Sequence, residues 1–522
     1  MFMTRRDRLQ FVGLGAVFLG LAVAGFGESA NSPTRPNVIV FLADDLGYGD
    51  LGCYGNPIVQ TPNIDKLAQE GLRLTDCHSA GTVCSPSRAA LLTGRTPYRT
   101  GFYTIAGGDG IHLRREEITL ATLLKKQGYD TCFVGKWHLG NLNNPASGQP
   151  GPGEHGFDHW FATQANAFDG PEHPGGFVRN GKKVGPIGQW YCDAIVSEAI
   201  AWLEHRPNPQ NPFFLLVCSH EPHTPLHPPE TYAQRYDNPT VDVLEKTIPY
   251  GQVPRPLTRN LSANKKYYYG TVTQLDDAFG TLMRGVDRLG FRENSLVVFT
   301  SDNGPETPVT LEESGGKWED PIRDRCFGTP GPFRGMKRFV YEGGHRVPGL
   351  VRWPGQIKPG TLSAELVNGT DWLPTICAMA GAPLPSDRVI DGTSLLPIFN
   401  GQTIKREIPV CWMFPVSDDY YYLPSMAMRQ GSWTLVGWFD PIAPGQNRSA
   451  WVKTTGLSRF ELFDLSIDLS QRYDLSQLSG AELGPMKETM IRLWQSIQSE
   501  APLWKTRPRA KNPAEARPAV SK

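Results

Sequence analysis

The chain has 522 residues, of which 52 are Lys or Arg and 52 are Asp or Glu, so its formal net charge at neutral pH is zero. This balance gives no sign of a nucleic-acid or acidic-polymer partner, and the composition is not that of a disordered or repeat protein. The length favours one large domain with a smaller appendage.

The N-terminus has the pattern of an export signal. Arg5, Arg6 and Arg8 precede an apolar run over residues 11–26, and small residues follow at 27–30. A charged segment, an apolar segment and a small-residue cleavage zone are typical of a signal peptide, which we predict over 1–30. The two adjacent arginines also resemble a twin-arginine signal. We therefore expect a periplasmic or secreted protein. The apolar run is short and Gly-rich, so no stable membrane span is expected, and an uncleaved anchor is the alternative.

Four apolar runs are predicted to be buried β-strands. They cover residues 38–42, 131–134, 213–218 and 296–299. Helical spacing of apolar residues lies between them, at 63–74, 120–126, 194–204 and 267–289. This alternation predicts an α/β fold with a large, mainly parallel sheet between helices. Polar residues follow each run, and ligands of such sheets bind beyond the carboxyl ends of the strands, so a single site is predicted there.

The sequence pattern changes after a Pro- and Gly-rich connector at 382–401. Short strands are predicted at 408–413, 425–428, 433–438 and 460–464, followed by a helix at 481–497. We predict a main domain over 31–401, a small C-terminal α+β subdomain with a short antiparallel sheet over 402–500, and a disordered tail over 501–522.

The stretch from Cys84 to Arg95 carries the strongest functional signal. Pro86 suits the first turn of a helix and Gly94 suits its C-cap, so Cys84 is predicted at a helix N-terminus. Such a position favours an anion, and Arg88 would lie one turn further along the same face. A buried structural cysteine before an ordinary helix is the competing interpretation.

Two pairs of residues with side-chain oxygens each follow a predicted strand. The pairs are Asp44-Asp45 and Asp302-Asn303. Clustered carboxylates repel each other unless a cation or a proton joins them, and oxygen ligands select calcium or magnesium over zinc. Each pair alone could instead cap the following helix. Two pairs at corresponding strand ends favour a divalent cation site.

The string Cys84-Ser85-Pro86-Ser87-Arg88, followed by Leu92-Thr93-Gly94-Arg95, resembles the signature of the type I sulfatases. Within that family the chain is most similar to the arylsulfatase A and N-acetylgalactosamine-6-sulfatase types. The resemblance implies an alkaline-phosphatase-like α/β sandwich. It also implies that a maturation enzyme oxidises Cys84 to formylglycine. In this family the modified residue joins Asp44, Asp45, Asp302 and Asn303 in binding calcium, with magnesium as the alternative.

The resemblance also assigns roles to other polar residues. Lys136 and Lys337 would bind the sulfate oxygens, and His138 would lie near the aldehyde hydrate. His223 would protonate the leaving alcohol, with His220 as second choice. Arg88 and the metal would lower the pKa of the attacking hydroxyl, and Asp302 would act as its base. Arg334 could add a second cation beside Lys337.

The activity implied is hydrolysis of a sulfate monoester, from a sulfated carbohydrate or an aryl sulfate. No nucleic-acid partner is expected. One alternative is a formylglycine-dependent phosphonate or phosphate ester hydrolase, because the same nucleophile can attack phosphorus. Another is an exported protein that binds sulfated glycans with an idle site.

Overall fold

A computed structural model describes residues 35–107, 110–167, 169–237, 262–306, 328–415, 424–443 and 446–504. The predicted signal peptide lies outside these residues. Within them, no helix is both long enough and apolar enough to cross a membrane.

A ten-stranded sheet forms the centre of the fold, in the order β11-β2-β10-β9-β1-β8-β4-β5-β6-β7. Its four adjacent middle strands are those predicted from the apolar runs: β9 (Ser295–Ser301), β1 (Asn37–Ala43), β8 (Phe213–Cys218) and β4 (Asp130–Lys136). All three pairings among them are parallel, so their carboxyl ends share one edge. The expected α/β class is confirmed.

Shorter strands extend the sheet on both sides, and several are antiparallel. On one side lie β10 (Gly349–Arg352), β2 (Leu72–Leu74) and β11 (Thr361–Ser363). On the other lie β5 (His159–Thr163), β6 (Val178–Arg179) and β7 (Lys182–Lys183). β10 runs antiparallel to both neighbours, and β6 runs antiparallel to β5 and β7. A separate two-stranded ladder joins β3 (Cys77–His78) to β12 (Val367–Asn368).

The helix expected over 63–74 was predicted too long. α1 spans Pro62–Glu70, and residues 72–74 form β2 instead. Gly71 separates the two elements in a non-helical conformation, and a Cβ there would lie 2.1 Å from the Val351 carbonyl oxygen. The close approach of β10 therefore decides where the helix ends.

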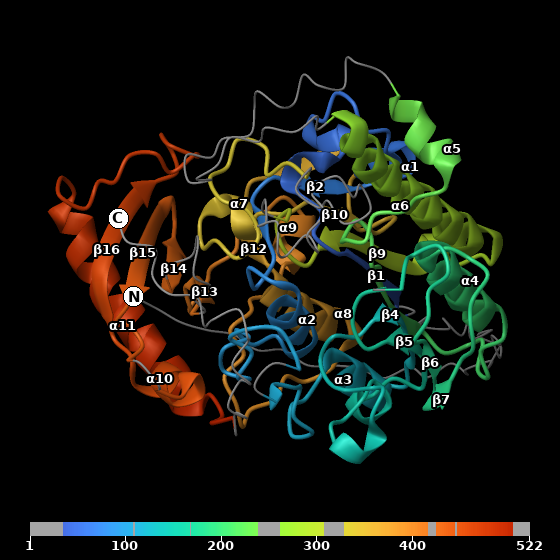
Figure 1. Cartoon of the computed structure of the whole chain (residues 1–522), viewed down its shortest axis with the longest axis horizontal. Helices are drawn as coiled ribbons and strands as arrows, with labels where there is room; N and C mark the ends of the chain where they lie inside the picture. The colour runs from blue at the N-terminus through green and yellow to red at the C-terminus, as the bar shows by residue number, and fades with distance from the viewer. Residues whose placement is uncertain are drawn as a thin grey trace, which may run out of the picture. The chain divides into compact units, whose positions relative to one another are not determined.

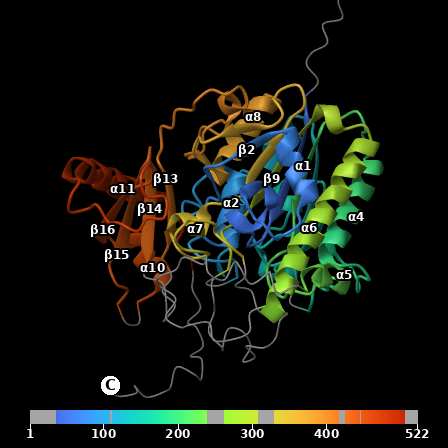
Figure 2. The ribbon, with the colours of Figure 1, turned by 90° about the horizontal axis from the view of Figure 1, so that it is seen from above.

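Helices cover both faces of the sheet (Figures 1 and 2). Alternate residues of β1 point to opposite sides, so Val38 and Val40 belong to one apolar cluster and Ile39 and Phe41 to another. One layer contains α2 (Cys84–Thr93), α3 (Leu120–Lys126) and α8 (Trp372–Ala380), and the other contains α1, α4 (Tyr191–Glu204) and α6 (Ser262–Arg288). Three single-turn helices are α5 (Glu230–Ala233), α7 (Glu342–His345) and α9 (Leu396–Phe399).

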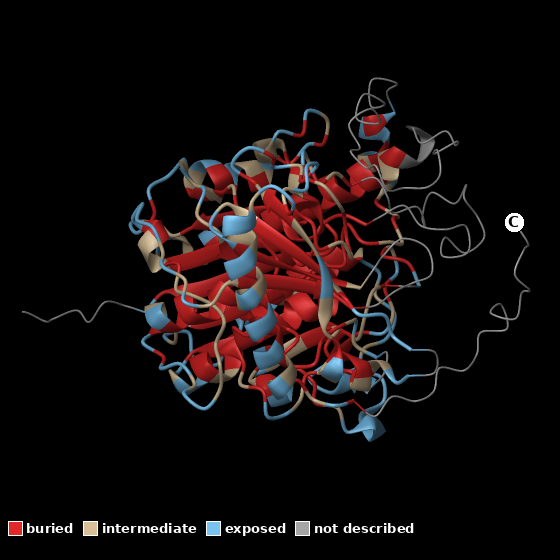
Figure 3. Ribbon diagram, turned by 90° about the vertical axis from the view of Figure 1, so that its left-hand side faces the viewer, coloured by how far each residue is buried: buried red, intermediate tan, exposed pale blue. Residues whose placement is uncertain are grey.

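The C-terminal part is a four-stranded antiparallel sheet, as expected. Its strands are β13 (Val410–Phe414), β14 (Ser425–Gln430), β15 (Trp433–Phe439) and β16 (Leu457–Asp464), with helices α10 (Arg448–Thr454) and α11 (Gly480–Glu500). One face packs on α11, whose outer side is exposed (Figure 3). On the other face, Trp412 and Phe463 share an apolar cluster with Val83 and Val340 of the main domain.

Two residues of the predicted tail, Ala501 and Trp504, are packed against the fold. Trp504 is buried, and its indole Nε1 donates a hydrogen bond to the Gly101 carbonyl at 2.9 Å. Residues 505–522 lie outside the described part of the chain, so the disorder predicted for them stays a prediction, as does the boundary at 401/402.

Candidate active site

Cys84 is the first residue of α2, and the helix ends where the sequence predicts. Gly94 adopts φ 67° at the C-cap, which is the left-handed conformation that glycine favours. The thiol is buried among charged groups. Burial raises its pKa, and the nearby cations of Lys136 and Lys337 only partly oppose this. A reactive thiolate requires the opposite shift, so the unmodified cysteine is poorly suited to act as a nucleophile.

The other polar residues of the Cys84 motif fix the surrounding backbone. The Ser85 hydroxyl donates to the His138 carbonyl at 2.7 Å, and the Ser87 hydroxyl contacts the Gly81 carbonyl at 3.1 Å. Arg88 donates two bonds to Asp302 Oδ2, at 2.9 and 2.7 Å. The motif therefore ties α2 to the loop before it and to two strand ends.

Asp44 and Asp45 follow β1, and Asp302 and Asn303 follow its neighbour β9, so all four side chains meet at one edge of the sheet. All are buried. The Asn303 amide donates to Asp45 Oδ1 at 2.7 Å, and the Asp45 backbone N–H donates to Asp302 Oδ1 at 3.3 Å. One ligand atom each from Asp44, Cys84 and Asp302 lies within 4.8 Å of the others.

Two oxygens of this cluster are buried without a hydrogen-bond donor, Asp44 Oδ1 and Asn303 Oδ1. Leaving such atoms unsatisfied is costly, so they indicate a missing partner. Burial and the Asp44 charge raise the pKa of Asp302 to about 7, despite Arg88. An all-oxygen set with repelling carboxylates and free lone pairs fits a hard divalent cation. The residues predicted from the sequence are therefore suited to hold one.

Lys136 ends β4 and reaches the same cluster. Its ammonium contacts Asp44 Oδ2. Burial raises the pKa of Asp44, but Lys136 together with His223 and Arg88 outweighs burial and holds that pKa below its usual value. His138, two residues on, adopts φ 54°, and its Nδ1 is buried without a hydrogen-bond partner. Burial and the adjacent Lys136 charge lower the pKa of His138 well below the ordinary value, so its ring is neutral.

Lys337 enters the cluster from the loop before α7. Its ammonium lies 2.7 Å from Asp45 Oδ1 and 3.3 Å from Glu306 Oε2. Burial alone would lower the pKa of this lysine, but the two carboxylates outweigh burial and raise it. Arg334 does not join Lys337 as expected. It donates to the Gln471 carbonyl and stacks over the Tyr341 ring at 3.8 Å, which leaves its charge directed elsewhere.

Of the two candidate histidines after β8, His223 lies nearer to the carboxylates. Its Nε2 is 3.5 Å from Asp45 Oδ2, whereas the His220 ring contacts Tyr191 with ring centroids 5.5 Å apart. The His223 Nδ1 lies 2.6 Å from the Thr224 carbonyl oxygen and 2.5 Å from the Asn166 amide nitrogen. The Asn166 amide lies 2.8 Å from Nε2. The geometry favours His223 over His220, in line with the first choice made from the sequence.

Sequence reasoning missed two residues of this site, Glu306 and Asn166. Glu306 is buried beside Lys337 and also pairs with Arg338. Its place four residues after Asp302 could have suggested it. Asn166 lies in an irregular loop after β5 and carries no pattern that would have indicated its contact with His223.

The charges of the site balance. Asp44, Asp45, Asp302 and Glu306 contribute four negative charges, and Arg88, Lys136, Lys337 and Arg338 contribute four positive charges; all of these side chains are buried except that of Arg338, which is half-buried. A divalent cation would therefore leave the site positive, and burial makes an unbalanced charge costly. The arrangement is suited to bind an anionic group next to position 84.

The sequence model of the family described as Sulfatase matches residues 36–382, and that of the N-sulphoglucosamine sulphohydrolase C-terminal region matches residues 333–434. The N-acetylgalactosamine-6-sulfatase of Canis lupus familiaris is 33% identical over 508 residues, covering 88% of this chain and 85% of the relative. Arylsulfatase A of Homo sapiens is 36% identical over 410 residues, covering 74% of this chain and 70% of the relative.

Solved structures are similar over most of the chain. The structure of Ps i-CgsB in complex with k-i-k-neocarrahexaose matches with a TM-score of 0.70 and 26% identity, covering 90% of this chain and 95% of the other. The phosphonate monoester hydrolase of Agrobacterium radiobacter matches with a TM-score of 0.60 and 20% identity, over 90% and 96% of the chains. The second likeness concerns the fold alone.

Proposed function

This chain belongs to the sulfatase family and is a sulfuric ester hydrolase; we propose that it acts through a formylglycine made from Cys84 and a bound calcium ion. The observation that carries this proposal is the convergence of two buried lysines, Lys136 and Lys337, on a carboxylate cluster beside position 84. Such a set binds an anionic ester and a divalent cation together.

The two absent groups would each supply one function. A formylglycine hydrate offers a hydroxyl that can attack sulfur, and a divalent cation favours ionisation of that hydroxyl and balances charge on the ester. Asp44, Asp45, Asp302 and Asn303 would hold the cation, supported by the unpartnered oxygens of Asp44 and Asn303. Calcium is proposed over magnesium because a mixed set of carboxylates and an amide in irregular loops suits the more flexible coordination of calcium.

The remaining roles fall to side chains of this chain. Lys136 and Lys337 would hold the sulfuryl oxygens, with charge stabilisation strongest as negative charge develops on them. Arg88 would hold Asp302 in place beside position 84, where Asp302, with its pKa raised to about 7, accepts the hydroxyl proton. By resemblance to the family, His223 would give a proton to the departing alcohol, and His138 would accept the proton released when sulfate leaves.

The proposed substrate is a sulfated carbohydrate, with an aryl sulfate as the laboratory substitute. Two relatives support the choice: one is named for N-acetylgalactosamine 6-sulfate, and the structure of Ps i-CgsB contains a neocarrahexaose. We further propose that a formylglycine-generating enzyme matures Cys84. Export to the periplasm or medium is proposed from the predicted signal peptide.

A comparison of hydrolysis rates tests whether the protein prefers sulfate esters to phosphorus esters. The mature protein should hydrolyse an aryl sulfate with a higher kcat/KM than the matched aryl phosphate or phosphonate. Faster turnover of the phosphorus ester would replace this proposal with the phosphonate hydrolase function. Tight binding of sulfated glycans without release of sulfate, by protein shown to carry the aldehyde, would favour the binding-protein function.

A further inference from the structure

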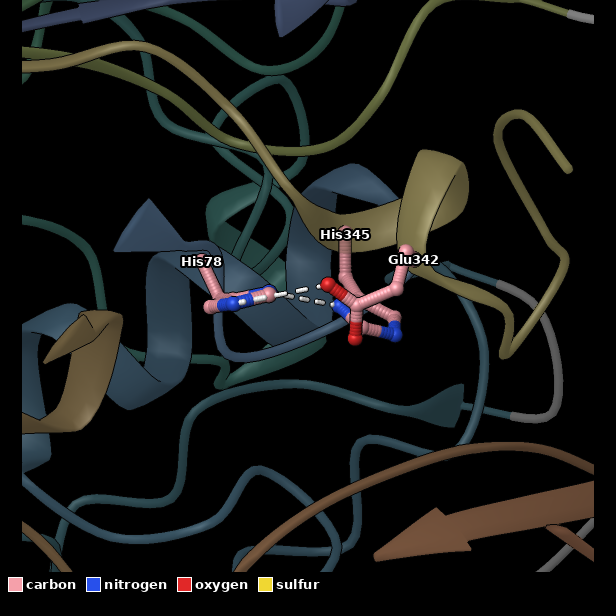
Figure 4. Close-up of side chains that lie close together, drawn as sticks. All are labelled: His78, Glu342 and His345. Carbon is pink, nitrogen blue, oxygen red and sulfur yellow. Dashed lines mark hydrogen bonds and ion pairs between the residues drawn. The ribbon is translucent and has the colours of Figure 1, made fainter. Parts of the chain in front are cut away.

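A second buried cluster lies away from the carboxylate site. His78 is the last residue of β3, and Glu342 and His345 begin and end α7. All three are fully buried or nearly so, and their side chains point towards one another (Figure 4). The ring atoms His78 Nδ1 and His345 Nδ1 are 2.9 Å apart, although the residues are 267 positions apart in the sequence.

The hydrogen bonds of the two Nε2 atoms show which ring nitrogens carry protons. His345 Nε2 is 3.1 Å from the Val340 carbonyl oxygen, and His78 Nε2 is 2.8 Å from Asp76 Oδ1. Neither oxygen can donate, so both Nε2 atoms must carry a proton. If both rings were neutral, the two Nδ1 lone pairs would then face each other at 2.9 Å. A third proton between them converts this repulsion into a hydrogen bond.

The surroundings place that extra charge on His78. Its Nε2 faces the Asp76 carboxylate directly and lies 3.9 Å from Glu342 Oε2. The His345 ring instead stacks on the Trp412 indole, with centroids 3.8 Å apart and planes at 7°. His345 is therefore the neutral acceptor.

A metal ion between the rings is the competing explanation, because His78, Glu342 and His345 are near enough to ligate one. Two arginines oppose it. Arg346 lies 2.8 Å from Glu342 Oε2 and 3.1 Å from Asp76 Oδ1, and Arg429 lies 3.3 Å from Glu342 Oε1 and 3.2 Å from Asp76 Oδ2. These two cations already balance the two carboxylates. A proton adds one buried charge, whereas a divalent metal ion adds two. A metal ion bound to the Glu342 carboxylate would also displace an arginine from it.

The cluster connects two chain segments of the proposed sulfate site, the loop that leads to Cys84 and the segment that contains Lys337. The His345 carbonyl accepts from the Ser79 backbone N–H at 2.8 Å, at the start of the loop that leads to Cys84. The same loop accepts from the other segment, because the Arg338 N–H donates to the Thr82 carbonyl at 2.8 Å. Arg338 adjoins Lys337. Arg429 of β14 pairs with Asp76, which joins the C-terminal sheet to the same cluster.

We propose that His78 and His345 share one proton, with His78 a buried imidazolium, and that this pair positions the loop of Cys84 against the segment of Lys337. Neither ring touches the proposed substrate, so both are positioning residues. The proton sharing stands on hydrogen-bond geometry alone. The effect on catalysis rests on the proposed sulfatase function.

Nitrogen NMR of histidine-labelled wild-type protein at neutral pH tests the proton directly. The proposal predicts protons on both nitrogens of His78 and on Nε2 alone of His345, with coupling across the Nδ1–Nδ1 bond. Metal analysis of the same sample should find no transition metal in this cluster. Two neutral rings, or one transition-metal ion per chain that is lost in His345→Leu, would overturn the proton sharing whatever the enzyme hydrolyses.

Two variants at one position test the positioning. Gln at 345 keeps an oxygen that can accept from His78, whereas Leu of similar size does not. With aldehyde content at position 84 matched by mass, kcat should fall roughly 10- to 100-fold in His345→Leu with KM little changed, as expected for a small misplacement of reacting groups. His345→Gln should recover most of that loss, and His205→Gln, at an exposed histidine, should change nothing. Equal kcat in the Leu and Gln variants would overturn the positioning role.

Discussion

Lys337 offers the sharpest test of the proposed sulfate site. Its ammonium is buried between Asp45 and Glu306, and its charge acts on the Cys84 thiol together with that of Lys136. Lys337→Met keeps most of the side-chain volume and removes the charge. The two carboxylates retain other partners, since Asn303 donates to Asp45 and Arg338 pairs with Glu306. We therefore expect the variant to fold and to keep its metal ion.

The size of the effect follows from the charge and its burial. A cation about 4 Å from an anionic oxygen contributes about 4 kcal/mol at an effective dielectric constant of about 20. Removal of one preorganised donor from a developing oxyanion costs about 2.7–4 kcal/mol in other enzymes, or 10²–10³-fold in rate. We expect kcat/KM for an aryl sulfate to fall by about the same factor, 10²–10³.

The assay is steady-state hydrolysis of an aryl sulfate by preparations with equal aldehyde content at position 84. Lys453→Met is the matched control, because Lys453 is a half-buried lysine that donates to the Ala501 carbonyl far along the chain, in the C-terminal subdomain. The control should retain full kcat/KM. A loss of less than about threefold in Lys337→Met, set against the 10²–10³ expected of an oxyanion donor, would refute a direct contact with the sulfuryl group.

Substitutions at three further positions, one of them with a matched control, test the nucleophile, the metal site and the fold. Cys84→Ala and Cys84→Ser should abolish turnover with the melting temperature nearly unchanged, and sulfatase activity retained in either would remove Cys84 from the mechanism. Asp302→Ala should lower the bound calcium, measured by elemental analysis, together with activity; full calcium occupancy in this variant would exclude Asp302 as a ligand. Gly135→Ala should unfold at clearly lower denaturant, because Gly135 adopts φ 104° and a Cβ would lie 1.9 Å from the Cys218 carbonyl oxygen. Gly148→Ala is its control, since φ is 69° there but no atom lies within 4 Å, and it should cost only about 1–2 kcal/mol.

The centre of the fold could be predicted because its strands are buried on both faces. Residues 38–42, 213–218 and the other two runs are continuously apolar, and that pattern has few alternative structures. The antiparallel and edge strands were missed because elements of two to four residues, such as β6 and β10, carry too little pattern. At β2 the helical spacing was misleading, since only the approach of β10 to Gly71 ends the helix.

The site residues could be predicted where a polar or charged side chain stands at the end of a predicted strand. Asp44 and Asp302 directly follow β1 and β9, and Lys136 ends β4, so their meeting follows from the parallel sheet that these strands share. Lys337 comes from a loop, and the resemblance to a family was needed to single it out. The contact between His78 and His345 had no signal in the sequence, because it depends on a loop and a single-turn helix brought together by tertiary packing.

The central claim is the conversion of Cys84, and mass spectrometry tests it most directly. Trypsin should release residues 74–88, between Arg73 and Arg88, from protein made in its own host. This peptide also contains Cys77, so fragmentation must locate the change. The account predicts an aldehyde or its hydrate at position 84 and an unmodified thiol at position 77. An unmodified thiol at 84 in well-folded protein that still hydrolyses sulfate esters would contradict the account.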